Sequence, residues 1–258
     1  MVTLQTVRRD APWSWLKAGW RDLVRAPMVS IGYGLIFVVT GLAITAGLWS
    51  LGMTSWIPVA TAGFALVAPA FAIGFYQVSR KLDAGETPRF SHVWLLRPGK
   101  ITQVALLGVF LIILLLFWVL IAQALYAYFA FGNFRPIGEF SSFALATPRG
   151  LTLLAVGTIA GGILAAFAFS ISALAFPMLV DQEVDAVTAL VASVMAVRAQ
   201  PFVMLTWAWL IAFWTILGTV AFLLGLAVIF PWLGHASWRA YQDFSPVPSP
   251  SRASAAAS

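Results

Sequence analysis

The residues that could carry out chemistry in this chain are few, and histidine is the rarest of them. Only His92 and His235 are present, and there is no cysteine, which excludes thiolate catalysis, iron–sulfur clusters and cysteine zinc sites. The two histidines could ligate one haem between them. His235, however, lies close in the sequence to Trp232 and Trp238, and such aromatic rings are typically found at the depth of the lipid headgroups. The neighbouring Gly234 also leaves a helix-packing role open. We therefore expect no haem, metal or other cofactor.

One acidic cluster is the other candidate site. Asp181 and Asp185 are four residues apart, with Glu183 between them, and on a helix they would share one face, as a cation or proton site requires. Acids at the start of a helix also cap its free N–H groups and match its dipole, and we favour this interpretation. The sequence carries no phosphate-binding loop, G-x-S-x-G or H-E-x-x-H motif. We expect a protein that is not an enzyme.

The composition is that of an integral membrane protein. The chain has 258 residues, of which 61% are hydrophobic and 9% charged, whereas soluble domains are about 25% charged. Too few polar side chains are available to cover a water-exposed surface. The net charge of +6 comes from basic residues that flank apolar runs, which indicates orientation in a bilayer and no binding of nucleic acid.

Four apolar runs are each long enough for one span, because about 20 residues cross ~30 Å of hydrocarbon. They cover residues 28–53, 55–78, 101–134 and 151–180. Pro69 and Pro177 lie within two of them and are expected to kink the helices. The last run, 201–238, has 38 uncharged residues, which is too long for one helix, so we expect two helices joined near Gly218. The predicted fold is all-α, with six transmembrane helices as three hairpins; five spans stay possible.

A pattern of an interfacial stretch, an arginine, a proline and a span occurs three times. The copies end at Arg25 and Pro27, at Arg97 and Pro98, and at Arg198 and Pro201. Proline suits the first helical position because its missing N–H costs no hydrogen bond there. The positively charged arginine side chain can bind a lipid phosphate at the membrane surface. We expect interfacial elements near residues 13–25, 90–96 and 184–198, with the three arginines at equivalent depth.

The first interfacial stretch is amphipathic. Helical spacing places its apolar residues on one face and its charged residues on the other. The predicted apolar face consists of Trp13, Leu16, Trp20, Leu23 and Val24, and the charged face of Lys17, Arg21, Asp22 and Arg25.

The site residues predicted from these patterns are interfacial or structural. The predicted contacts with lipid phosphate or the interface are Arg25, Arg97, Arg198, Trp20, Trp238 and His235. Gly157 and Gly161 form G-x-x-x-G with Gly162 beside it, which predicts close helix packing. We expect a cytoplasmic segment over residues 1–27, a membrane domain over 28–244, and a disordered Pro/Ser/Ala-rich tail over 245–258.

Four ordered stretches resemble one bacterial family. They are AGWRDLVRAP, LVAPAFAIGFYQVSRKLDAGE, FPMLVDQEVDAVTAL and PWLGHASWRAYQDF, which together span roughly residues 15–244. Their combination is similar to the integral membrane proteins catalogued as domain of unknown function 2189, some of which are labelled cytochrome c oxidase subunits. The resemblance implies a multi-span protein of the inner membrane and supplies no catalytic residues.

Two functions from different classes fit these features. The first is a non-catalytic subunit, assembly factor or scaffold of a larger membrane complex such as a respiratory oxidase, with membrane lipid and another integral membrane protein as partners. The alternative is a binder or carrier of a small hydrophobic molecule such as a lipid or quinone. A groove lined by Phe, Trp and Thr would favour the carrier, and a tightly packed bundle with one flat apolar flank would favour the accessory protein.

We predict six spans in the bacterial inner membrane with both termini cytoplasmic, because this topology places 13 of the 15 basic residues on the cytoplasmic side. A reporter fused after residue 245 should be active in the cytoplasm. A periplasmic C-terminus would contradict both the six-span count and the threefold repeat.

Overall fold

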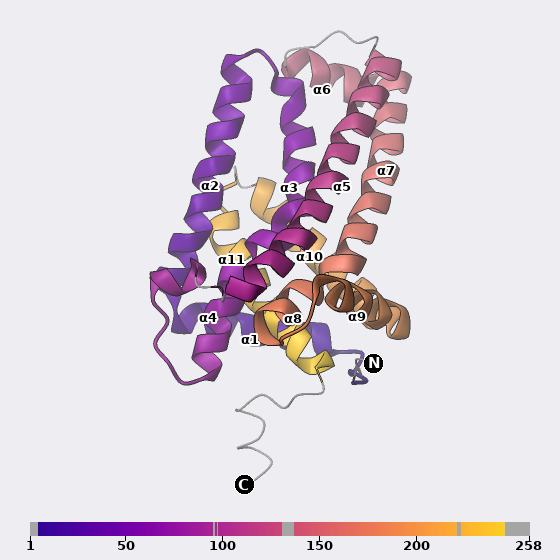
Figure 1. Cartoon of the computed structure of the whole chain (residues 1–258). Coiled ribbons are helices and arrows are strands. Elements are labelled where there is room, and N and C mark those ends of the chain that lie inside the picture. Colours follow the sequence, from indigo (N-terminus) through magenta and orange to yellow (C-terminus); the bar gives the residue numbers. More distant parts are fainter. Residues whose placement is uncertain (1–4, 95, 97, 131–136, 221–222, 246–258) are drawn as a thin grey trace. The chain divides into compact units, whose positions relative to one another are not determined.

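The computed structural model describes residues 5–94, 96, 98–130, 137–220 and 223–245, and these residues form helices joined by short connections (Figure 1). The elements are α1 (Ala11–Arg25), α2 (Pro27–Ser50), η1 (Thr54–Trp56), α3 (Ile57–Phe71), α4 (Ile73–Asp83), η2 (Phe90–Trp94), α5 (Pro98–Ala130), α6 (Ile137–Ala146), α7 (Pro148–Ser172), α8 (Ala175–Asp181), α9 (Ala186–Ala199), α10 (Pro201–Val220) and α11 (Leu226–Phe244).

The predicted all-α, multi-span membrane fold is confirmed. Among the described residues, five segments are long and apolar enough to cross a membrane: Pro27–Ser50, Thr54–Asp83, Gly99–Ala130, Pro148–Asp181 and Pro201–Val220. The count of six is not confirmed. The expected sixth span falls on α11, whose second half carries His235, Arg239 and Asp243, so that its apolar stretch is short.

The long run 201–238 is divided into two helices, as predicted. The break comes later than expected, because α10 continues past Gly218 to Val220 and α11 begins at Leu226. Gly218 instead allows the two helices to meet, since a Cβ on it would lie 3.0 Å from the Leu226 side chain and one on Gly225 would lie 2.8 Å from the Gly218 Cα. Leu223 in the connection has a φ of 65°.

Prolines begin three helices where the repeat predicted them. α2 begins at Pro27, α5 at Pro98 and α10 at Pro201, each preceded by a helical element, respectively α1, η2 and α9. The depth of these elements in a membrane stays a prediction. Arg97 and residues 246–258, the greater part of the predicted tail, lie outside the described residues.

Two compact units make up the chain, and their boundaries fall within α2, α3, α5 and α7. Unit 1 takes its residues from Met1–Val38, Pro69–Leu107 and Ser170–Ser258, and unit 2 takes its residues from Val39–Ala68 and Gly108–Phe169. Unit 1 is therefore assembled from both ends of the chain, and unit 2 from the middle.

The predicted faces of α1 are corrected by the packing of unit 1. Its buried side faces α11 and consists of Ala11, Pro12, Trp15, Leu16, Gly19, Asp22 and Leu23. Trp13, Trp20 and Val24 are instead 46–59% exposed, on the same side as the basic residues. Asp22 turns inward because an arginine of α11 meets it there, and this partner is 217 residues away in the sequence.

Large aromatic rings fill the space between α1, α10 and α11. Trp15 is 1% exposed, and its ring lies edge-on to Trp207 with centroids 5.5 Å apart. Its indole N–H donates to Asp243 Oδ2 at 2.7 Å. The other close contact is Gly19, where a Cβ would lie 2.5 Å from the backbone nitrogen of Ala236. Only glycine allows α1 to approach α11 so closely.

Both proline-containing spans are broken, and a hydroxyl from another helix hydrogen-bonds at each break. α3 ends two residues after Pro69, and the Tyr33 hydroxyl donates to the Phe71 carbonyl at 2.9 Å. α7 ends at Ser172, before Pro177 in the first turn of α8, and the Leu174 N–H donates to Ser193 Oγ at 3.2 Å. Proline disrupts the helical ladder, so buried polar groups at the breaks need such partners.

Replacement of Gly19 by alanine should lower the free energy of unfolding by about 1–3 kcal/mol, because the new methyl group meets the backbone of α11. Thermal unfolding of the purified protein in detergent measures the effect. Gly47→Ala is the matched control, since a Cβ on this helical glycine meets no atom within 4 Å. Equal melting of the two variants would contradict the close α1–α11 contact.

Candidate functional site

A buried ion-pair network joins three helices of unit 1. Arg239 of α11 donates through Nη2 to Asp22 of α1 at 2.6 Å and through Nη1 to Asp83 of α4 at 2.7 Å. The Asp22 side chain is 2% exposed and that of Asp83 is 10% exposed. The Trp238 indole and the Gln242 amide also donate to Asp83 Oδ2, at 2.9 and 2.7 Å. One cation thus holds two buried carboxylates and therefore three helices.

A chain of hydrogen bonds continues from Asp22 to the fully buried His235. Ser79 Oγ donates to Asp22 Oδ2 at 3.0 Å and lies 2.8 Å from His235 Nδ1, while Ser30 Oγ lies 2.9 Å from Nε2. A carboxylate only accepts, so the single Ser79 proton goes to Asp22. His235 Nδ1–H must then donate to Ser79, and Nε2 accepts from Ser30.

The network keeps His235 neutral and Arg239 charged. Burial, assisted by the Arg239 charge, lowers the pKa of His235 to about 3; α11 lies outside the five candidate spans. Burial also raises the pKa of Asp22 above its ordinary value, against the opposing effects of Arg239 and Ser79. For Arg239, burial works against the charge, but Asp22 and Asp83 outweigh it and raise its pKa.

A serine hydrogen-bonded to a histidine is the arrangement of an activated nucleophile, but the surroundings here do not support catalysis. Ser30, Ser79 and His235 are each 0% exposed, so no substrate reaches them in this conformation. A base near pKa 3 is also far from the range that proton transfer at neutral pH needs. The network is a structural link between α1, α4 and α11.

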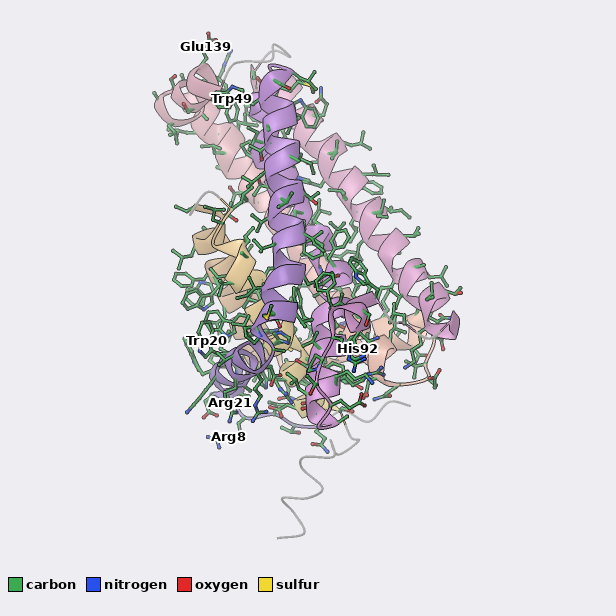
Figure 2. All side chains as sticks on the ribbon, turned by 90° about the vertical axis from the view of Figure 1, so that its left-hand side faces the viewer. Arg8, Trp20, Arg21, Trp49, His92 and Glu139 are labelled. Atoms are coloured by element: carbon green, nitrogen blue, oxygen red, sulfur yellow. The ribbon has the colours of Figure 1, made fainter. Side chains whose placement is uncertain are left out.

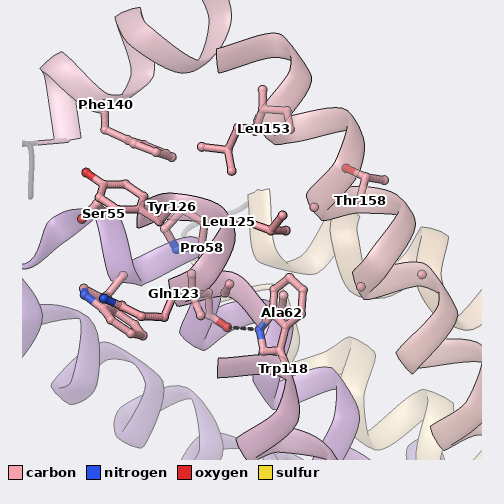
Figure 3. Close-up of a pocket in the computed structure, with 17 residues that line it drawn as sticks. Ser55, Pro58, Ala62, Trp118, Gln123, Leu125, Tyr126, Phe140, Leu153 and Thr158 are labelled. Carbon is pink, nitrogen blue, oxygen red and sulfur yellow. Dashed lines mark hydrogen bonds between the residues drawn. The ribbon is translucent and has the colours of Figure 1, made fainter. Parts of the chain in front are cut away.

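A cavity of about 360 Å³ lies within unit 2 (Figure 3). Its walls come from η1, α3, α5, α6 and α7, and 17 residues line it: Ser55, Trp56, Pro58, Val59, Ala62, Trp118, Ala122, Gln123, Leu125, Tyr126, Phe140, Leu153, Leu154, Gly157, Thr158, Gly161 and Gly162. Aromatic, aliphatic and glycine residues dominate this lining. It contains the Phe, Trp and Thr side chains that the carrier hypothesis requires.

The walls of this pocket are fixed by specific contacts. The Trp118 indole N–H donates to the Val59 carbonyl at 2.9 Å, the bond drawn as a dashed line in Figure 3. Tyr126 and Phe140 lie together, with ring centroids 6.0 Å apart. Ser55 is 5% exposed, and its hydroxyl has no hydrogen-bond partner among the described residues. The contacts of Trp118 and Tyr126 therefore give the pocket a preformed apolar wall, and the Ser55 hydroxyl is buried away from its open space.

The predicted interfacial residues fall into two groups. Trp20, Arg25 and Arg198 are exposed, and Figure 2 shows Trp20 projecting from α1 beside Arg21. His235 and Trp238 are instead buried, at 0% and 2% exposure, and bind the serines and Asp83 of the network. This environment differs from the headgroup contact predicted for them.

The three predicted packing glycines are all in the pocket wall. A Cβ on Gly161 would lie 3.1 Å from the Trp118 ring, so this glycine packs closely. A Cβ on Gly157 or Gly162 would meet no atom within 4 Å. These two glycines leave space, whereas the motif predicted contact.

The acidic cluster is divided among separate partners. Asp185 caps α9, and its side chain accepts from the Thr188 N–H at 2.9 Å, as the capping interpretation predicted. Asp181 accepts from the Tyr241 hydroxyl at 2.7 Å, and Glu183 lies 3.6 Å from Lys100 Nζ. Asp181 ends α8 and Asp185 precedes α9, so the two do not share a helix face.

Comparison with known proteins confirms the family resemblance. The family model described as "Predicted integral membrane protein (DUF2189)" matches residues 56–181, just under half of the chain. The matched segment begins at the last residue of η1 and contains α3 and all of the pocket lining except Ser55. No curated protein and no solved structure matches the sequence. The protein is thus an integral membrane protein with several apolar helices.

Arg239→Met should destabilise the protein by about 3–5 kcal/mol at neutral pH, because two buried carboxylates lose their counterion. Their pKa values in the folded state should then rise above those of the unfolded chain. Such groups favour folding at low pH and lose this effect as the pH rises, so the deficit should shrink at pH 5.

The matched control is Arg8→Met, since the pair of Arg8 with Asp10 is exposed and should contribute little. Thermal unfolding of both variants at pH 5 and pH 8 measures the difference. A pH-independent loss in Arg239→Met would contradict the role of the carboxylates.

Proposed function

We propose that the protein binds a small hydrophobic molecule of the membrane in the pocket of unit 2. The cavity of about 360 Å³ carries this proposal. It falls in the range of about 300–1,000 Å³ that is typical of small-molecule sites, and its lining has the usual combination of apolar walls and a few polar groups.

The glycines of α7 support a role for the empty space. Ordinary side chains at Gly157 and Gly162 would have room in the structure, and a helix interior is more stable with alanine than with glycine by about 0.5–1 kcal/mol. Retaining glycine at both positions keeps the wall of the pocket open at a cost in helix stability. The open wall leaves room for a bound molecule beside α7.

A ligand dissolved in the bilayer would reach this unit without crossing water. Exposed apolar residues accompany the lining on the same helices, among them Leu116 and Leu120 on α5 and Ile159 and Ile163 on α7. Apolar surfaces of this kind favour contact with hydrocarbon over contact with water. The proposal assigns no catalytic step, and it places the protein in a bacterial inner membrane.

The accessory role in a larger membrane complex, such as a respiratory oxidase, is the second proposal. Exposed aromatic side chains, including Trp49 and Trp209 at 63% and 60%, would suit contact with another membrane protein. Lipid contact explains such side chains equally well, because the surface of a membrane protein is apolar wherever it faces hydrocarbon. The pocket therefore gives the binding proposal precedence.

Filling the pocket tests the binding proposal. The protein should be extracted in polymer-bounded membrane discs without detergent, and bound molecules identified by native mass spectrometry. We expect a co-purified hydrophobic molecule in the wild type and its loss in Gly157→Leu, whose side chain would occupy the cavity.

Gly47→Leu is the control, because Gly47 is also a helical glycine with open space around it but does not line the pocket. This variant should retain the bound molecule. An unoccupied wild-type protein, or occupancy that survives in Gly157→Leu, would count against the proposal, and a co-purified protein partner would favour the accessory role.

A further inference from the structure

We infer that the exposed face of α1 docks on the headgroups of the membrane surface and selects anionic lipid over zwitterionic lipid. The inference goes beyond the proposed binding function and does not depend on the pocket of unit 2. The sequence predicted contacts of single residues with lipid phosphate. The structure adds a continuous face whose composition gives a preference among lipids.

Basic and aromatic side chains share this face. Lys17, Arg21 and Arg25 are exposed and follow one another at intervals of four residues, so they form one line along the helix. The exposed Trp13 and Trp20 lie beside that line, and Figure 2 shows Trp20 next to Arg21. No ion pair among the described residues uses the three basic side chains. Their charges are therefore available to a partner outside the protein.

The one acidic residue of α1 is withdrawn from this face. Asp22 is turned inward, where Arg239 pairs with it at 2.6 Å. Asp10, which directly precedes the helix, is paired with Arg8 at 2.6 Å. The exposed face of α1 thus carries three positive charges and no negative charge, so its electrostatic complement is an anionic surface.

The position of α1 in the chain favours the membrane surface as that partner. Arg25 ends α1 and Pro27 begins α2, a candidate span, so one residue separates the basic line from the start of the span. The headgroups lie at the ends of a span, where tryptophan is enriched. Exposed tryptophan beside a line of basic residues is typical of helices that lie in the headgroup plane.

The preference for anionic lipid has an electrostatic cause. A zwitterionic headgroup such as that of phosphatidylcholine carries its own cation, so a basic side chain gains little net attraction from it. Phosphatidylglycerol has a net negative charge, and one basic residue near an anionic surface favours association by roughly 5-fold. Phosphatidylglycerol should therefore be concentrated beside α1.

The experiment places a fluorescent label on this face, which is simple because the chain has no cysteine. Ser14→Cys carries the label, since Ser14 is exposed and lies about one turn from Lys17. The full chain is reconstituted in phosphatidylcholine discs with equal, small fractions of acyl-chain spin-labelled phosphatidylglycerol or phosphatidylcholine. A nitroxide quenches only a fluorophore close to it, so quenching measures the lipid composition beside α1.

We expect phosphatidylglycerol to be enriched at this label by roughly 5-fold over phosphatidylcholine. High salt should reduce the enrichment, because it screens exposed charges. Equal quenching by the two lipids would overturn the inference, and so would an enrichment that high salt leaves unchanged. If neither lipid quenches the label, α1 does not lie at the bilayer and the inference fails.

Leu51→Cys is the control position for the label. Leu51 is exposed and directly follows α2, and no charged residue occurs between Arg25 and Arg80. The two lipids should quench a label there equally. The same enrichment at both positions would show a preference of the whole protein and would contradict the assignment to α1.

Removal of the charges tests which residues carry the preference. The α1 variant combines Lys17→Gln, Arg21→Gln and Arg25→Gln. It should lose the enrichment and keep the wild-type melting temperature, because these side chains are exposed. The matched control removes three charges elsewhere in unit 1 and should retain the enrichment: Arg8→Gln, Lys81→Gln and Arg89→Gln.

An enrichment that survives in the α1 variant, or that the control loses equally, would overturn the inference. The comparisons between lipids and between salt concentrations decide it even if the α1 variant does not fold. None of these results depends on the pocket, whose occupancy is tested separately with Gly157→Leu.

Discussion

Unit 1 depends on a single cation that is shared by two buried carboxylates. Arg239 of α11 contacts Asp22 of α1 and Asp83 of α4. None of these three helices directly follows another in the sequence. A buried ion pair is not in itself strong evidence for stability, since desolvation offsets much of the attraction. Its value here is geometric, because a displaced helix would leave a carboxylate in an apolar interior. The close approach at Gly19 and the hydrogen bonds of His235 require the same alignment.

The two units differ in how their buried hydroxyls are satisfied. In unit 1, hydroxyls and amides are satisfied by partners from distant parts of the chain, such as Tyr33 at the α3–α4 break and Ser193 at the α7–α8 break. In the described part of unit 2, Thr54 and Ser55 have buried hydroxyls without partners. The first arrangement is typical of a scaffold, because it fixes helices from distant parts of the chain against one another.

Local chemistry accounts for what the sequence alone predicted. The helix starts at Pro27 and Pro201 were predictable because proline has a fixed φ and no N–H to lose, and the Asp185 cap was predictable because its acceptor serves its own helix. The buried face of α1 was not, since tryptophan suits either an interior or an interface, and the partner of Asp22 lies near the other end of the chain. The G-x-x-x-G motif was interpreted as a helix contact, because the spacing of residues in the sequence does not show how much space lies beside each glycine. Gly157 and Gly161 share a helix face, yet Trp118 fills the space beside only one of them.

The order of synthesis gives the Arg239 link a further meaning. A ribosome completes every residue of unit 2 before it reaches the last helix of unit 1, since Phe169 precedes Leu226. Asp22 and Asp83 therefore enter the assembling protein as carboxylates without their counterion, and the main packing partner of α1 is made last. The packing of the first helix against the last can therefore form only at the end of synthesis. A product truncated before residue 239 would keep both carboxylates without the arginine that neutralises them.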